Sequence, residues 1–325
     1  MSHRLAKTAP VLAILAILAL VFTACSSSDS SSNGDTIAVA TNEGEVQVPR
    51  DPQRVVVLDN TSAETVKAMG VTPVAVPKGL LAPSIFQDWI DDPDIADVGT
   101  HGEPKMEVIE DVDPDLIIAG YRFEKYYDEL TKITDQTGGA TIDIAASDTA
   151  EGGRVAAMIR QTETLGEIFG KQDQATEIVD EFTGKLDAAK SVSTGQTVFL
   201  AIVSGGKIDN GAKRMEPLIA PLDLKDVFAG QAGDHHQNSG LTPEAIAQAN
   251  PQWVIVMDRD AATAQDGEQP QAAKAVFDAQ EAFAGTEFMQ KDQVIYLDPA
   301  FYLREGIQSY AASYQQIADA LGAAK

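Results

Sequence analysis

Two segments of seventeen residues share one pattern, which we call the repeated phrase: MEVIEDVDPDLIIAGYR at residues 106–122 and PEAIAQANPQWVIVMDR at residues 243–259. Both copies place a glutamate, an isoleucine, a proline and a final arginine at the same intervals, 137 residues apart. Four matched positions in a helix, proline and strand pattern indicate two copies of one structural unit. The sequence therefore predicts two similar lobes.

The segments around the two copies alternate between short β-branched runs and amphipathic stretches. In the first lobe the runs include RVVVLD (54–59), DLIIAG (115–120) and ATIDIA (140–145), and in the second TVFLAIV (197–203). Such alternation is typical of an α/β fold with mainly parallel sheets flanked by helices. Before the first run, the alternating residues 36–49 predict a β-hairpin.

The stretch 153–189 interrupts this alternation and is expected to connect the lobes. Its apolar residues recur at helical spacing, which predicts one long linking helix, with Gly166 and Gly170 as points where it could break. The predicted lobes are then residues 36–152 and 190–325. The second ends in a closing amphipathic helix over 306–322.

The beginning of the chain has the pattern of an export signal. Arg4 and Lys7 precede an apolar run at 11–22, which is followed by small residues and Cys25. We expect residues 1–24 to be a signal peptide and the serine-rich residues 25–35 to be a flexible tether. FTAC resembles the lipobox of bacterial lipoproteins, so Cys25 is expected to carry lipid. The alternative is an ordinary signal peptide beside a free thiol.

The charge and the cysteine count limit what the mature chain can do. Without Arg4 and Lys7 it has 22 basic residues against 49 acidic ones, a net charge of −27 with neutral histidines. Such a surface repels nucleic acid, so no nucleic-acid partner is expected. Cys25 is the only cysteine, so no intramolecular disulfide forms and apolar packing must hold both lobes.

Longer stretches around both copies resemble one protein family. DVGTHGEPKMEVIEDVDPDLIIAGYR (97–122), SGLTPEAIAQANPQWVIVMDR (239–259) and VIYLDPAFYL (294–303) are similar to segments of the substrate-binding proteins of ABC importers for ferric siderophores, haem and cobalamin. They look most like the binders of ferric catecholates. The resemblance runs from about residue 36 to the end. It implies a class III periplasmic-binding-protein fold and a monomer that delivers its ligand to a membrane permease with its ATPase.

Three arginines match the family positions that meet the metal complex: Arg122, Arg214 and Arg259. Iron(III) held by three catecholates carries a net charge of −3, and guanidinium groups stay protonated while donating several directed hydrogen bonds. The alternative for Arg122 and Arg259 is a salt bridge, for instance with Glu124 or Asp258. The match at Arg214 rests on fewer residues, and Lys213 is its neighbour.

One histidine and one tyrosine of the family complete the iron coordination when the siderophore leaves sites open. The histidine position falls at His235 or His236, and Tyr302 matches the tyrosine. Imidazole nitrogen and phenolate oxygen suit iron(III). The alternative is a solvated histidine pair and a tyrosine that packs beside the ligand, since a hexadentate siderophore needs no protein ligand.

Glu107 and Glu244 lie near the other end of the repeated phrase. They match the glutamates that dock onto permease arginines in the family, one in each lobe. An acid in the first turn of a helix is also favoured by the helix dipole, which is the simpler interpretation.

The remaining function classes have weaker support in the sequence. No GxSxG, HExxH, P-loop or GxGxxG motif occurs, so we expect no enzyme and no permanently bound cofactor. A lipoprotein for bare zinc or manganese could use His101, His235 and His236, but three arginines would not help to bind a cation. The sequence predicts an exported protein, lipid-anchored on the outer face of a Gram-positive type membrane or facing the periplasm. The resemblance implies that it captures an iron(III)-siderophore of catecholate type, with haem or cobalamin as alternative ligands.

Overall fold

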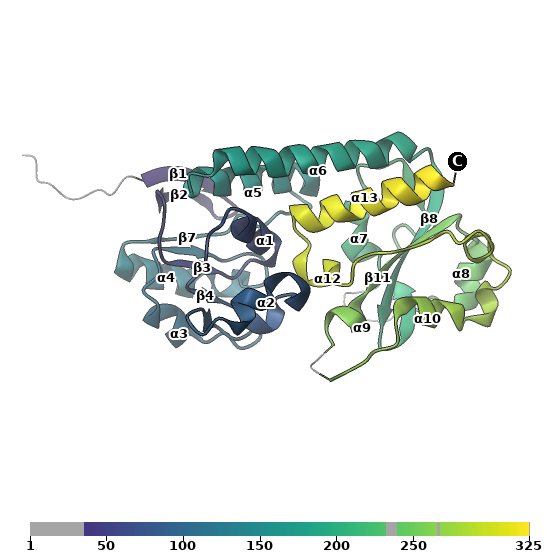
Figure 1. Cartoon of the computed structure of the whole chain (residues 1–325), viewed down its shortest axis with the longest axis horizontal. Helices are drawn as coiled ribbons and strands as arrows, with labels where there is room; N and C mark the ends of the chain where they lie inside the picture. The colour runs from purple at the N-terminus through teal and green to yellow at the C-terminus, as the bar shows by residue number, and fades with distance from the viewer. Residues whose placement is uncertain (1–35, 232–238, 265–266, 325) are drawn as a thin grey trace, which may run out of the picture. The chain divides into compact units, whose positions relative to one another are not determined.

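The computed structural model describes residues 36–231, 239–264 and 267–324 (Figure 1). The predicted signal peptide, the tether with Cys25, and the pair His235 and His236 lie outside the described residues. Predictions about them therefore stay predictions. Within the described ranges, no helix combines the length and the apolar character needed to cross a membrane.

The N-terminal lobe is built on a five-stranded parallel sheet in the order β5-β4-β3-β6-β7. Its strands are β3 (Val55–Val57), β4 (Ala75–Val76), β5 (Ala96–Asp97), β6 (Leu116–Ile118) and β7 (Ala140–Ile142). The predicted hairpin precedes them as antiparallel β1 (Thr36–Thr41) and β2 (Gly44–Pro49). Helices α1 (Asn60–Ala68), α2 (Pro83–Asp91), α3 (Met106–Asp111) and α4 (Tyr127–Thr137) follow individual strands, with 3₁₀ turns η1 (Lys78–Leu80) and η2 (Glu124–Tyr126).

The short β-branched runs form strands because both faces of this sheet are covered. Val55 and Val57 belong to one apolar cluster, and Val56 between them belongs to another. All three are almost fully buried. Parallel strands covered by helices on both faces read as continuous apolar runs, which explains the pattern in the sequence.

The C-terminal lobe repeats this topology. Its sheet has the order β10-β8-β11-β12, all parallel, and β9 pairs antiparallel with the end of β8. The strands are β8 (Gln196–Ser204), β9 (Lys207–Asn210), β10 (Leu224–Asp226), β11 (Trp253–Asp258) and β12 (Val294–Tyr296). The helices are α7 (Ala212–Ile219), α8 (Pro243–Ala249), α9 (Arg259–Ala262), α10 (Ala273–Asp278), α11 (Glu287–Gln290), α12 (Phe301–Arg304) and α13 (Ile307–Ala323), with the 3₁₀ turn η3 (Glu281–Phe283). The prediction of two lobes with mainly parallel sheets is confirmed.

The two copies of the repeated phrase fold alike. Each forms a short helix and then a central strand, α3 with β6 and α8 with β11. Ile109 and Ile246 are fully buried. Asp113 and Asn250, each directly before a proline, both have positive φ, 42° and 45°. The repeat in the sequence is therefore a repeat in the structure.

The linking stretch is two helices, so the prediction of one continuous helix was wrong in this respect. Helix α5 ends at Ile168 and α6 spans Gln172–Val192. Gly170 between them has φ 63°, a left-handed conformation that ends an α-helix. Ala175 of α6 packs in the N-terminal core, and Phe182 packs in the C-terminal core. Helix α6, about 30 Å long at 1.5 Å per residue, therefore spans both lobes. Helix α13 packs along it (Figure 1).

A second contact between the lobes involves α1 and the segment after α12. The Asn60 side-chain amide donates hydrogen bonds to the carbonyl oxygens of Leu303 and Arg304, at 3.0 and 3.1 Å. Arg304 also lies 3.4 Å from the Glu64 carboxylate, and both side chains are largely buried. These bonds hold residues 303–305 against the N-terminal lobe.

Candidate ligand-binding site

Arg122 is positioned by a turn that follows β6. Gly120 begins the turn with φ 74°, and a Cβ there would lie 2.6 Å from Asp59 Oδ1. Only glycine fits both constraints. The turn leaves the residue Tyr121 41% exposed and lets Arg122 Nε donate to the Tyr121 hydroxyl at 3.2 Å.

Arg259 is positioned differently, as the first residue of α9 directly after β11. The side chain of Asp258 caps this helix by accepting from Ala261 N at 2.9 Å, and its second oxygen accepts from Ala273 N. Arg259 Nε donates to the Tyr302 hydroxyl and Nη1 donates to Ser204 Oγ, both at 3.2 Å. The guanidinium is therefore held from two sides.

Arg214 lies in α7, next to the same tyrosine. Its guanidinium carbon is 4.6 Å from the centre of the Tyr302 ring, within the range of a cation–π contact. Its Nη1 donates to Glu305 Oε1 at 3.0 Å. The side chain is 19% exposed, so this ion pair is partly desolvated.

The contacts of the three arginines form one continuous chain of side chains. The Tyr121 hydroxyl donates to Glu305 Oε2 at 3.0 Å and so joins the N-terminal lobe to the other two arginines. We call this set the arginine network, and its members are Arg122, Tyr121, Glu305, Arg214, Tyr302, Arg259 and Ser204. The structure brings together all four described residues for which ligand contact was predicted.

Three members of the arginine network were missed in the sequence: Tyr121, Glu305 and Ser204. Tyr121 directly precedes the predicted arginine and could have been noticed. Ser204 is 55 residues from its partner, and Glu305 lies 184 residues from Tyr121, so no local pattern connects them.

The charges in the network change the pKa values of nearby groups. Burial of the hydroxyl and then the Glu305 carboxylate raise the pKa of Tyr121, although its ring is partly exposed. Burial lowers the pKa of Arg214, but Glu305, Tyr302 and Tyr121 together outweigh burial, so that the pKa rises. Partial desolvation and then the charge of Arg122 lower the pKa of His101. The raised pKa of Arg214 favours its charged form, and the lowered pKa of His101 favours its neutral form.

The alternative salt bridges are not the contacts that the structure shows. Asp258 binds backbone amides of α9 and α10, and Glu124 is exposed in η2. Glu107 and Glu244 are both exposed in the first turns of α3 and α8. They occupy equivalent places, as predicted from the repeat. Among the described residues, no group of three His, Cys, Asp or Glu side chains is arranged to hold a metal ion.

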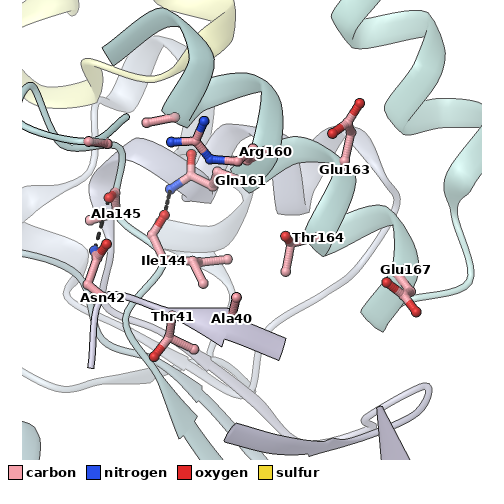
Figure 2. Close-up of a pocket in the computed structure, with 12 residues that line it drawn as sticks. Ala40, Thr41, Asn42, Ile144, Ala145, Arg160, Gln161, Glu163, Thr164 and Glu167 are labelled. Carbon is pink, nitrogen blue, oxygen red and sulfur yellow. Dashed lines mark hydrogen bonds between the residues drawn. The ribbon is translucent and has the colours of Figure 1, made fainter. Parts of the chain in front are cut away.

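A pocket of about 440 Å³ lies apart from the arginine network, between β1 and α5 (Figure 2). Small side chains such as Ala40, Thr41 and Ala145 line it, with the exposed Arg160 and Glu163 among its charged groups. None of the predicted site residues lines this pocket.

Comparisons with known proteins identify the family of the chain. The model of the family described as periplasmic binding protein matches residues 55–301, which include the parallel sheets of both lobes and the whole arginine network except Tyr302 and Glu305. The chain belongs to the periplasmic binding protein family. Its curated relatives carry names of binding proteins rather than of enzymes.

The petrobactin-binding protein YclQ of Bacillus subtilis is 27% identical, over 97% of this chain and 99% of the relative. Its crystal structure superposes with a TM-score of 0.74 over 88% of this chain and 99% of that chain, at 26% identity. The putative ABC transporter substrate-binding lipoprotein YhfQ, also of B. subtilis, is 27% identical over 81% of this chain and 84% of the relative. The ferric-anguibactin-binding protein FatB of Vibrio anguillarum is 28% identical over 69% of each chain.

Proposed function

We propose that this protein is the substrate-binding component of an ABC importer and captures an iron(III)-siderophore, of catecholate type, at the arginine network. The observation that carries the proposal is that Arg214 and Arg259 meet at Tyr302 and that Tyr121 and Glu305 join Arg122 of the other lobe to them. The names of YclQ and FatB support the ligand class.

The arrangement suits an anion bound between guanidinium groups. Charge-assisted hydrogen bonds from arginine to catecholate oxygens are strong and directional. In a mature chain with a net charge of −27, a local positive cluster is needed to offset the surrounding field. The exposed ring of Tyr121 adds an aromatic face on which a catechol ring could stack.

Tyr302 is also a candidate iron ligand. Its hydroxyl accepts from Arg259, and Arg214 lies over its ring, so two cations would offset the charge of a phenolate bound to iron. We propose that it coordinates iron together with His235 or His236 when the siderophore leaves two sites open.

Binding is tested with the soluble chain that starts after Cys25. It is titrated with a ferric catecholate, a ferric hydroxamate, haem and zinc while tryptophan fluorescence is followed. We expect the catecholate to bind, and Arg122→Ala or Arg259→Ala to weaken it at least 30-fold, the usual effect of removing one partner of a desolvated charge pair.

Arg160→Ala is the matched control, since it removes one exposed arginine at the other pocket. It should leave catecholate affinity within twofold of the parent. Binding of zinc alone, or equal effects of all three variants, would disprove the proposal.

Delivery is proposed to use Glu107 and Glu244 as docking points for the permease, with the protein held at the membrane by lipid on Cys25. The name of YhfQ as an ABC transporter lipoprotein supports this. The double variant Glu107→Gln with Glu244→Gln should abolish most cellular iron uptake and leave siderophore affinity unchanged. Glu110→Gln, which alters an exposed acid of the same helix α3, is the control. Normal uptake by the double variant would refute docking at these residues.

A further inference from the structure

Glu305 is a buried carboxylate inside the arginine network. Only 5% of the residue is exposed, and its two oxygens accept from Arg214 Nη1 and from the Tyr121 hydroxyl, each at 3.0 Å. Buried carboxylates are rare and are normally paired. This one is paired with an arginine that the proposed function assigns to the ligand.

The backbone at Glu305 is also unusual. It ends helix α12 with φ 48° and ψ 21°, the left-handed conformation that glycine adopts without strain. A strained non-glycine residue among binding groups points to a functional constraint. A glycine would fit the backbone at position 305 better, yet the glycine of this segment is the next residue, Gly306, and position 305 has a carboxylate.

Two arginines outside the network, Arg154 and Arg304, have carboxylates of their own beside them. Arg154 pairs with Asp148, and Arg304 lies beside Glu64. The members of the arginine network itself carry three guanidinium charges and one carboxylate, a net charge of +2.

We propose that Glu305 is a fixed internal anion that sets the charge of the preferred ligand. It would make the site favour a ferric complex with two negative charges, for example two catecholates and one hydroxamate, over a tris-catecholate with three. This inference rests on the proposed function and narrows its ligand class. The full positive charge of three arginines would instead suit a trianion.

The size of the effect follows from Coulomb's law. At roughly 7 Å and an effective dielectric constant of about 20, each added ligand charge interacts with Glu305 strongly enough to change affinity by about tenfold after screening by salt. Neutral complexes should be insensitive to this residue.

The test measures dissociation constants for gallium(III) complexes with charges of 0 (trihydroxamate), −2 (mixed catecholate and hydroxamate) and −3 (tris-catecholate). In the parent the dianion should bind best. Glu305→Gln should strengthen binding by about tenfold for each negative charge of the complex, so the gain relative to the neutral complex is larger for the trianion than for the dianion. Glu305→Gly removes the same charge and relieves the backbone strain, so it should act in the same direction even if glutamine disturbs the packing.

Two further variants separate charge from contact. Glu124→Gln removes an exposed acid near Arg122 in the sequence and should change no ratio by more than twofold. Tyr121→Phe removes a hydrogen bond to Glu305 without changing charge, so it should shift all three affinities by a similar factor. If neither Glu305 variant raises the ratio of trianion to neutral affinity, the inference is wrong.

A metal-free anion distinguishes this failure from failure of the proposed function. Pyrophosphate should bind more tightly to both Glu305 variants than to the parent. If no metal complex binds the parent but this increase occurs, the proposed function fails, while the effect of the Glu305 charge on anion binding stands. If metal complexes bind without the change in ratio, only the proposed role of Glu305 fails.

Discussion

The two copies of the repeated phrase differ at their last turn, although they begin alike. In the C-terminal copy, β11 continues through Met257 and Asp258 directly into α9. In the N-terminal copy, β6 stops at Ile118, and the equivalent positions are Gly120 and Tyr121 in a turn. One arginine is therefore placed by a capped helix and the other by a glycine turn.

This difference assigns distinct tasks to the two arginines. Arg259 is fixed by Tyr302 and Ser204 of its own lobe, which preorganises it for a ligand. Within the described residues, the Arg122 side chain hydrogen-bonds to its neighbour Tyr121, and Tyr121 hydrogen-bonds to Glu305 of the other lobe. The N-terminal copy thus has a contact between the lobes where the C-terminal copy has a helix cap.

The largest expected effect comes from breaking the glycine turn. Gly120→Ala would place a Cβ against Asp59 and force a non-glycine residue to φ 74°. We expect a loss of about 3 kcal/mol in the free energy of unfolding, because the strain and the steric overlap add. Urea denaturation measures it.

Gly138→Ala is the matched control, because Gly138 has φ 75° but no atom within 4 Å of the added Cβ. It should cost about 1 kcal/mol. Equal losses for the two variants would show that the close contact with Asp59 contributes nothing.

A smaller effect is expected from breaking the helix cap of the C-terminal copy. Asp258→Ala removes acceptors for two backbone amides and should lower the free energy of unfolding by about 2 kcal/mol. It should also weaken binding of the ferric ligand, since Arg259 directly follows the capping residue. Asp278→Ala, at an exposed pair with Lys274, is the control and should leave the free energy of unfolding nearly unchanged. Full stability of the Asp258 variant would contradict the assigned cap.

Much of this architecture could be predicted from the sequence because it is encoded locally. Apolar runs marked the strands, and the intervals from Glu107 to Arg122 and from Glu244 to Arg259 marked the repeat. The same periodicity could not decide whether residues 153–189 form one helix. That depended on Gly170, whose left-handed conformation became evident only in the structure.

The partners within the site could not be predicted in the same way. Glu305 is one of 49 acidic residues, and its role depends on a contact with Tyr121, 184 positions away. Likewise, Asp258 resembled a salt-bridge partner for Arg259, but its oxygens face backbone amides. Such roles are set by tertiary packing rather than by neighbours in the chain.

The smallest expected effect is a change in the pKa of His101, which senses Arg122 but not Arg259. The pKa of His101 is lowered by partial desolvation and by Arg122. Since the folded protein binds this proton more weakly than the unfolded chain, His101 reduces stability as the pH falls through its folded-state pKa. Arg122→Ala should raise the pKa of His101 part of the way towards 6.5, because the desolvation remains.

Titration of the His101 ring signals by NMR measures this directly in the parent and in two variants. Arg259→Ala is the control, because it removes the equivalent arginine of the other copy and should leave the pKa of His101 unchanged. An equal rise in both variants would mean that His101 senses the net charge of the protein rather than the turn at Arg122. No rise in Arg122→Ala would place the guanidinium away from His101, and the N-terminal arginine would then be less closely fixed than its contact with Tyr121 indicates.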